Sequence, residues 1–206
     1  MKFKNHLIIF SKNPRYASVK KRLANKIGDL EALRFYQNVL QKNIRILGGD
    51  KRWSCSLALS NNKSKVKREI TDSCKVIYQG YGCLGERMDN CLHKVLGESV
   101  VLIGGDIPNI RSSTISIAFK KLRFYDFVFG PSFDGGFWLI GVKGICNYRK
   151  KNTKDIFNSV RWSSEYALSD VKKNITNKKI YLLDFKNDVD TYEDLNKNKL
   201  ILSRYN

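Results

Sequence analysis

The stretch SVVLIGGDIP, residues 99–108, decides the fold class. Its apolar run from Val100 to Ile103 does not alternate with polar residues, which is typical of a strand buried on both faces in a parallel sheet. Two glycines, Asp106 and Pro108 follow that run. Ligands of open α/β sheets bind beyond the carboxyl ends of the strands. A carboxylate at this place suits a hard divalent cation, which prefers oxygen ligands; the alternative is an aspartate that caps a helix or closes a turn.

Strand-like and helix-like segments alternate along the rest of the chain. Asp29 and Ser112 are the expected N-caps of two of the helices. The alternation predicts a three-layer α/β fold around a mixed, mostly parallel sheet. No repeat or linker divides the sequence, so a single domain over residues 1–206 is expected. The other strands are expected at 7–10, 52–60, 74–79, 126–130, 136–142 and 179–185, and the helices at 19–27, 29–42, 84–97, 112–125, about 153–174 and 191–200.

The chain is strongly basic. Its 206 residues include 38 Lys and Arg against 19 Asp and Glu, a formal net charge of +19. Such a charge attracts polyanions, among them nucleic acid, anionic membranes and phosphorylated ligands. The basic residues are scattered, however, and Lys, Asn and Ile are all abundant, so AT-rich coding is the alternative explanation of the excess. No recognised nucleic-acid-binding motif is present, and aromatic residues are not interleaved with the basic runs.

The cysteines indicate neither a metal site nor a disulfide framework. They are odd in number, form no CxxC pair, and lie far in sequence from His6 and His93. Reduced thiols favour a cytoplasmic location. The apolar run at 7–10 is too short for a signal peptide, and nothing approaches the roughly 20 apolar residues of a membrane span. The five cysteines are Cys55, Cys74, Cys83, Cys91 and Cys146.

The segment GPSFDGGFWLIG, residues 130–141, places Asp134 directly before Gly135 and Gly136. Glycines permit a positive φ or the close approach of a ligand. Asp-Gly is also a standard hairpin-turn pair. Both a ligand-facing aspartate and a plain turn therefore remain open at this point.

Two further segments carry charge in places that suit a site. Residues 11–23, SKNPRYASVKKRL, form a basic loop that enters a helix, which indicates either an anion site or a solvated helix start. This loop is neither a Walker P-loop nor a GxGxxG fingerprint. In NDVDTYEDL, residues 187–195, Asp188 and Asp190 alternate, and only one of them is expected to face inward. That acid either returns to the cation at Asp106 or belongs only to the start of a capped helix.

Six segments in this order resemble a bacterial glycosyltransferase-like family, the selenodomain-associated transferase 1 type. This family belongs to the GT-A nucleotide-diphospho-sugar transferase superfamily. The resemblance spans roughly residues 7 to 195 and implies a Rossmann-like GT-A fold that binds a nucleotide or nucleotide-sugar. The segments are KNPRYASVKKRL (12–23), QGYGCLGERM (79–88), GGDIP (104–108), GPSFDGGFWLIG (130–141), FNSVRWS (157–163) and DVDTYEDL (188–195).

The resemblance also implies roles for particular residues. Mg²⁺ or Mn²⁺ bound at Asp106 would neutralise the diphosphate of the nucleotide donor. Asp134 would act as a base or hold an acceptor hydroxyl. The implied residues are Lys12, Lys20 and Arg22 for phosphate, Asp106 and Asp190 for the cation, Asp106 and Asp134 for catalysis, and Gly135, Gly136, Glu86 and Arg87 for substrate.

The sequence departs from the family pattern at three positions. Ala17 stands where glycine is usual, Lys21 where threonine is usual, and Cys83 where aspartate is usual. These departures bear on the phosphate loop and on the segment before Glu86, and altered activity is one expectation.

The leading hypothesis is a metal-dependent glycosyltransferase that uses a nucleotide-activated sugar and a small-molecule or lipid acceptor. The first alternative is a nucleotidyltransferase that joins an NTP to a phosphorylated small molecule; the absence of a GGxGxR loop argues against it. The second alternative is a degenerate domain that binds polyanions.

Overall fold

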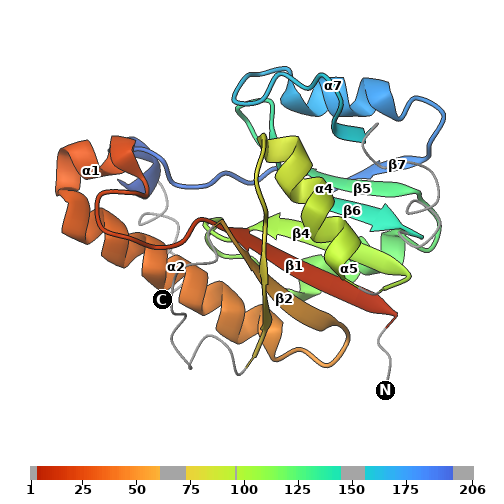
Figure 1. The fold of residues 1–206 in the computed structure, drawn as a ribbon, viewed down its shortest axis with the longest axis horizontal. Coiled ribbons are helices and arrows are strands. Elements are labelled where there is room, and N and C mark those ends of the chain that lie inside the picture. The colour runs from red at the N-terminus through yellow and green to blue at the C-terminus, as the bar shows by residue number, and fades with distance from the viewer. Residues whose placement is uncertain (1–3, 61–72, 96, 145–155, 197–206) are drawn as a thin grey trace.

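The computed structural model describes residues 4–60, 73–95, 97–144 and 156–196. Within them, seven strands form one sheet in the order β3-β2-β1-β4-β6-β5-β7 (Figure 1). The apolar run of residues 100–103 lies in β4, at the centre of the sheet, as its unbroken hydrophobicity predicts. The strands are β1 (Asn5–Ser11), β2 (Ser54–Leu59), β3 (Lys75–Tyr78), β4 (Ser99–Gly104), β5 (Phe127–Pro131), β6 (Phe137–Lys143) and β7 (Ile180–Leu182).

The sheet is mixed and mostly parallel, which confirms the prediction. β1 pairs in parallel with β2 and β4, β2 with β3, and β5 with β7. β6 is the exception, because it pairs antiparallel with both β4 and β5. A short turn joins β5 to β6, and so short a connection can only join antiparallel strands.

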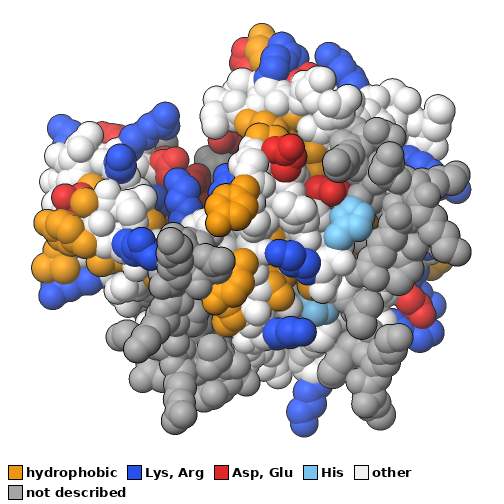
Figure 2. All heavy atoms as spheres, in the orientation of Figure 1, with side chains coloured by type: hydrophobic (Ala, Val, Ile, Leu, Met, Phe, Trp, Pro, Cys, Tyr) orange, Lys and Arg blue, Asp and Glu red, His pale blue; other side chains and the backbone are white. Residues whose placement is uncertain are grey.

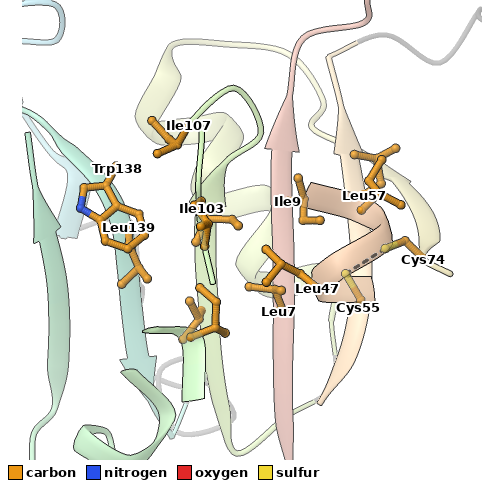
Figure 3. Close-up of a cluster of buried hydrophobic side chains, with 14 of the residues drawn as sticks. Leu7, Ile9, Leu47, Cys55, Leu57, Cys74, Ile103, Ile107, Trp138 and Leu139 are labelled. Atoms are coloured by element: carbon orange, nitrogen blue, oxygen red, sulfur yellow. Dashed lines mark hydrogen bonds between the residues drawn. The ribbon is translucent and has the colours of Figure 1, made fainter. Parts of the chain in front are cut away.

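Helices cover both faces of the sheet and make the predicted three layers. α2 and α5 pack on one face, where Leu40 and Phe119 share a core with Ile9 and Ile103. α4 and α7 pack on the other face, where Leu92 and Val171 share a core with strand residues such as Ile8. The first core appears in Figure 3. The helices are α1 (Lys21–Ile27), α2 (Asp29–Gly48), α4 (Leu84–Lys94), α5 (Ser112–Lys121) and α7 (Ala167–Asn174).

The short helix α1 lies away from the sheet. It packs against the start of α2 and the segment near residue 190, and Figure 1 shows these together at one side of the molecule. Leu23, Ala32, Val189 and Leu195 form this small separate core, and the first three are not exposed to solvent. This packing brings the late acidic segment beside the basic loop that precedes α1.

Several predicted helix limits are wrong. Gly28, with φ of 84°, precedes α2, so Asp29 is its first helical residue rather than its N-cap. Ser112 is likewise the first residue of α5, after Arg111. α2 continues to Gly48 because its apolar face continues through Ile44 and Leu47.

The helix predicted over about 153–174 is the largest error. Residues 153–155 lie outside the described residues, and the helix α7 begins only at Ala167. Ser159 and Ser163 have positive φ, a conformation that a right-handed helix does not contain. The intervening segment is therefore a loop that packs Phe157 and Trp162 against one another.

No helix within the described residues is both long and apolar enough to cross a membrane. The four described cysteines are free thiols, with only Cys83 exposed; Cys146 lies outside the described residues. Lys and Arg side chains are scattered over the face shown in Figure 2 rather than gathered in one patch. On the described part of this face, these side chains do not form a continuous track for a polyanion.

Candidate active site

Three segments that follow strands meet at the carboxyl edge of the sheet. The basic loop follows β1, the Gly-Gly-Asp segment follows β4, and residues 188–190 come after β7. β1 and β4 are neighbours, with Phe10 opposite Gly104. The amide of Gly105 donates a hydrogen bond of 2.9 Å to the carbonyl of Phe10, which fixes the two exits beside each other. This edge is where open α/β sheets bind ligands.

The ammonium of Lys20 holds these segments together. Its Nζ lies 2.7 Å from Asp106 Oδ2, 2.9 Å from Asp188 Oδ2 and 2.7 Å from Asp190 Oδ1. The Lys20 side chain is only 3% exposed. Its backbone adopts the left-handed conformation, φ 49° and ψ 46°, which is unfavourable for a residue with a Cβ. This backbone conformation directs the Lys20 side chain inward, toward the three carboxylates. We call these four residues the Lys20 cluster.

The expectation that only one acid of residues 188–190 faces inward is wrong, because both Asp188 and Asp190 bind Lys20. The physical reason is the period of an extended chain, in which residues i and i+2 point to the same side. Val189, between them, points the other way and is fully buried beside Leu23. A cation at this edge thus meets three carboxylates rather than two.

The Lys20 cluster is electrically unbalanced, with three carboxylates around one ammonium. Burial raises the pKa of Asp188 to about 6; Lys20 opposes this shift and the negative charge of Asp106 adds to it. Burial acts in the same direction on Asp190, but Lys20 outweighs it and the pKa of Asp190 is lowered. Burial also opposes the charge of Lys20, yet the three acids raise its pKa above the usual value. The cluster therefore keeps excess negative charge that a second cation would neutralise.

The Lys20 cluster lies in the wall of a cavity of about 470 Å³, which we call the basic cavity. Arg87 enters it from α4 and donates through Nη1 to Gln79 Oε1 at 3.2 Å. Its Nε is buried and has no hydrogen-bond partner. A buried donor without a partner indicates a place where an anion would bind. The other cationic side chains that line the basic cavity are Lys12, Lys20, Lys21 and Arg22.

Buried polar side chains form the floor beneath the basic cavity. Gln79 is fully buried and donates through Nε2 to the carbonyls of Ser11 and Ala58, at 2.9 and 3.0 Å. The hydroxyl of Tyr36 lies 2.7 Å from Ser11 Oγ, and burial raises its pKa to about 12. These contacts fix the strand ends and keep Tyr36 protonated as a donor.

A second cavity of about 280 Å³ adjoins the basic cavity, and we call it the aromatic cavity. Asp106 and Asp188 line both cavities, as does Gly104. The rings of Phe137 and Trp162 meet edge to face, with centroids 6.3 Å apart. The remaining polar lining comes from Ser132, Asp134, Ser163 and Ser164. The two shared carboxylates thus stand at the junction of a cationic cavity and an aromatic, hydroxyl-rich one.

The structure distinguishes the residues of the Asp-Gly-Gly turn. Asp134 is exposed and lines the aromatic cavity, while its Oδ1 accepts the amide of Gly136 at 3.0 Å. Gly136 also lines this cavity. Gly135 has φ of 83°, and a Cβ there would collide with the backbone of Glu165. Its carbonyl accepts the amide of Leu168. Gly135 therefore joins the hairpin to the segment before α7 and does not face the cavity.

Glu86 and Arg87, expected together at the substrate, point to different places. Arg87 reaches the basic cavity, whereas Glu86 accepts the amide of Cys83 at 2.8 Å and lines a separate cavity of about 600 Å³. Consecutive residues on a helix point about 100° apart, so one turn of α4 cannot send both to the same site. Glu86 is thus a capping residue at the start of α4.

The structure places each of the three departures from the family pattern. Ala17 has φ of 53°, the region where glycine carries no steric cost. Cys83 is the N-cap of α4 and lies outside the basic cavity, so an aspartate at this position would cap the helix. Lys21 lines the basic cavity and adds a positive charge to it.

The donor chemistry of the Lys20 cluster fits a hard divalent cation, because three carboxylates converge on one point. Asp106 and Asp190 are the acids that the sequence predicts for this role, and Asp188 joins them. Within the described residues, however, no group of three or more His, Cys, Asp and Glu is arranged to hold a metal ion as it stands. The carboxylate oxygens surround the Lys20 ammonium instead.

Comparison with known proteins assigns the family and the fold. Residues 44–164 match the family described as uncharacterized proteins conserved in bacteria, DUF2064, and the chain belongs to this family. No curated protein matches the chain. A Desulfovibrio desulfuricans G20 protein, provisionally named a nucleotide-diphospho-sugar transferase, is similar over 99% of both chains, with 23% identity and a TM-score of 0.82.

Two other solved structures share the fold at lower similarity. The 4-diphosphocytidyl-2C-methyl-D-erythritol synthase from Anaerococcus prevotii DSM 20548 has 11% identity and a TM-score of 0.67, over 98% of this chain and 96% of that one. Glucosyl-3-phosphoglycerate synthase from Mycobacterium tuberculosis, in complex with Mg²⁺ and UDP, has 9% identity and a TM-score of 0.53, over 90% and 71%. The Rossmann-like nucleotide-diphospho-sugar transferase fold that the sequence predicts is thus confirmed.

Proposed function

We propose that this protein is a transferase that uses a nucleotide-activated sugar and a divalent cation, Mg²⁺ or Mn²⁺. The observation that carries the proposal is the junction of the basic and aromatic cavities, at which Asp106 and Asp188 line both. A bond between a phosphate and a sugar placed across this junction would lie beside the carboxylates. The proteins that share the fold include a diphosphocytidyl-methylerythritol synthase and a glucosyl-3-phosphoglycerate synthase in complex with Mg²⁺ and UDP, which supports the choice of donor.

The basic cavity supplies the donor-binding half. Lys12, Lys21 and Arg22 bring positive charge from the loop after β1, and Arg87 brings it from α4 with an unpartnered buried Nε. Cationic donors held in place favour phosphate and stabilise charge that develops on a leaving diphosphate. Asp106, Asp188 and Asp190 would hold the cation, which when bound neutralises the diphosphate as a Lewis acid.

The aromatic cavity supplies the half that receives the sugar and its acceptor. Flat rings and a few polar groups are the usual lining of a site for a small polar ligand. Ser163 and Ser164 offer hydroxyls, and Asp134 offers a carboxylate with one oxygen already bound to the Gly136 amide. We assign Asp134 to accept a hydrogen bond from the acceptor hydroxyl, as a base or as a positioning group.

Nucleotidyl transfer is the second candidate, because a nucleotidyl enzyme shares the fold over almost the whole chain. The two reactions break different bonds. Sugar transfer releases a nucleoside diphosphate, whereas nucleotidyl transfer releases pyrophosphate from an NTP. The aromatic cavity beside the acids favours sugar transfer.

The test incubates the purified protein with Mn²⁺ and a panel of nucleotide-sugars or of NTPs with sugar phosphates. With no other acceptor present, water takes the sugar, and we expect the wild-type protein to release one nucleoside diphosphate from one nucleotide-sugar and Asp106→Asn not to do so. Asp50→Asn is the matched control, because Asp50 pairs with Arg52 away from both cavities. Release of pyrophosphate would instead assign nucleotidyl transfer. Release of neither product, from a folded sample, would overturn both assignments.

A further inference from the structure

We propose that Lys20 is an exchangeable internal cation: its ammonium occupies the divalent-cation site and leaves when the metal ion enters. This inference deepens the proposed function and rests on it. It concerns what the chain does at the three carboxylates before any donor binds.

The geometry makes the two cations mutually exclusive. The Lys20 nitrogen lies within 2.9 Å of an oxygen from each of Asp106, Asp188 and Asp190. Mg²⁺ binds oxygen ligands at about 2.0–2.1 Å, so the same three oxygens would have to close further around a metal ion. No room remains for the ammonium at the centre of that group. The metal ion can therefore bind all three acids only if the Lys20 side chain moves away.

The charges favour this exchange. Three carboxylates and one ammonium leave a net charge of about −2, and replacing the ammonium by a divalent ion reduces this to about −1. Asp106 and Asp188 carry like charges and each lies within 2.9 Å of the same Lys20 nitrogen, so they repel one another. The ammonium thus holds the acids together but neutralises them incompletely.

The backbone of Lys20 is fixed, while its side chain is flexible and lies beside a cavity. The Lys20 carbonyl accepts the amide of Ala24 at 2.9 Å, and the neighbouring Val19 is buried, so the backbone is fixed at the start of α1. The four-carbon stem is flexible. Lys20 also lines the basic cavity of about 470 Å³. When the ammonium leaves the acids, it gains access to the cavity that we assign to phosphate.

A functional consequence follows. Entry of the metal ion delivers the Lys20 charge to the donor cavity, beside Lys21 and Arg22. Metal ion and diphosphate should therefore strengthen each other's binding, by about tenfold for a typical coupling between sites. Without a metal ion, Lys20 remains with the acids and the basic cavity has one cation fewer.

The first test measures the reactivity of Lys20 in the wild-type protein. The amines are acetylated with N-hydroxysuccinimidyl acetate and quantified by mass spectrometry, with EDTA or with Mn²⁺ alone. The exposed Lys21 serves as the internal reference. We expect Lys20 to be protected in EDTA and to become several-fold more reactive in Mn²⁺, while Lys21 does not change. Unchanged protection of Lys20 at Mn²⁺ concentrations that occupy the site would overturn the proposal.

The second test measures Mn²⁺ affinity by electron paramagnetic resonance in Lys20→Met and in the control Lys42→Met, whose exposed side chain on α2 lines neither cavity. Removing the competing ammonium should tighten Mn²⁺ binding by about tenfold in Lys20→Met only. Equal or weaker binding in Lys20→Met would contradict the exchange. If Lys20→Met does not fold, the labelling of the wild-type protein still decides.

Neither test contains a nucleotide, so their outcomes are separate from those of the proposed function. If Lys20 exchanges with Mn²⁺ but no nucleotide binds, the proposed transferase function is contradicted and the exchange of Lys20 is supported. If a nucleotide binds but Lys20 stays protected in Mn²⁺, the exchange is contradicted and the transferase function is supported.

Discussion

Two clusters of charge in this protein differ in balance. In the Lys20 cluster, three carboxylates share one buried ammonium. Near α7, Arg161 pairs with the single acid Asp170 through two hydrogen bonds of 2.8 Å, and Asp170 also accepts the Arg161 amide at 3.2 Å. The ion pair between Lys20 and Asp106 joins segments more than 80 positions apart in the sequence. The pair between Arg161 and Asp170 closes a loop of fewer than ten positions.

The pKa values of Asp170 and Asp188 are shifted in opposite directions, while that of Asp190 in the Lys20 cluster is lowered, as for Asp170. The Arg161 guanidinium lowers the pKa of Asp170 to about 2. Burial and the neighbouring acids raise the pKa of Asp188 to about 6, despite Lys20. A pair in which each acid has its own cation stabilises a fold, whereas a cluster with surplus acids stores charge that a ligand can neutralise. The balance of charge thus separates the structural cluster from the candidate site.

The largest expected effect separates the clusters by activity. Asp106→Asn should reduce donor turnover by about 100-fold or more, because it removes a carboxylate that holds the cation at the leaving diphosphate. Asp170→Asn should leave turnover per folded molecule nearly unchanged. Steady-state rates, corrected for the folded fraction by circular dichroism, measure both. Equal losses of turnover in Asp106→Asn and Asp170→Asn would contradict the assignment of the Lys20 cluster to the active site and of the Arg161 pair to the fold.

A second effect separates two adjacent glycines by stability. Gly135→Ala should destabilise the protein by about 2–4 kcal/mol, because its φ is positive and a Cβ would collide with the Glu165 backbone. Gly136→Ala should cost less than about 1 kcal/mol, since its Cβ would meet only the Asp134 side chain, with Oδ1 nearest at 3.2 Å. Urea denaturation gives both values. Similar values would mean that the Glu165 backbone does not confine Gly135.

A third effect concerns acid. The pKa of Asp170 in the folded protein, about 2, is below its ordinary 3.8. Its contribution to stability is therefore complete above about pH 4 and is lost as the pH falls toward 2. Urea midpoints measured over this range should fall less steeply for Asp170→Asn than for the wild type. Parallel curves would show that the Arg161 pair does not stabilise the fold.

The smallest effect concerns the acid that is missing at position 83. Cys83→Asp should stabilise the protein by about 0.5–1 kcal/mol, because aspartate is a better N-cap and favours the positive end of the α4 dipole. Cys83→Ala should give no such gain, and donor turnover should not change in either variant. An increase in turnover with Cys83→Asp would instead place this position with the site.

The sequence predicts the parts of this fold that depend on local pattern. The unbroken apolar run before Asp106 indicates a central strand, and the carboxylate after it marks the ligand edge. Motif order further predicts Asp190 and Arg87, and the structure brings both to the basic cavity. The strand prediction is confirmed because strand burial leaves a signal within a few residues, whereas Asp190 and Arg87 follow from the family resemblance and their roles stay predictions.

What the sequence does not predict depends on contacts between distant segments. Lys20 lies in a basic run with Lys21 and Arg22, and only its left-handed turn sends it to Asp106 and Asp188. No local pattern encodes that turn. The roles of Tyr36 and Gln79 depend in the same way on where β1 ends. Gln79 did leave one signal, a polar amide directly after the strand Lys75–Tyr78.

The most direct test of the central claim is a thermal-shift panel of nucleotides and nucleotide-sugars, with and without Mn²⁺. A ligand that binds only the folded state raises the melting temperature. We predict that one nucleoside diphosphate or its sugar stabilises the wild-type protein in the presence of Mn²⁺ and does not stabilise Asp106→Ala. The absence of a shift with every nucleotide, or an equal shift in Asp106→Ala, would contradict the assignment of this edge of the sheet to a cation and a diphosphate.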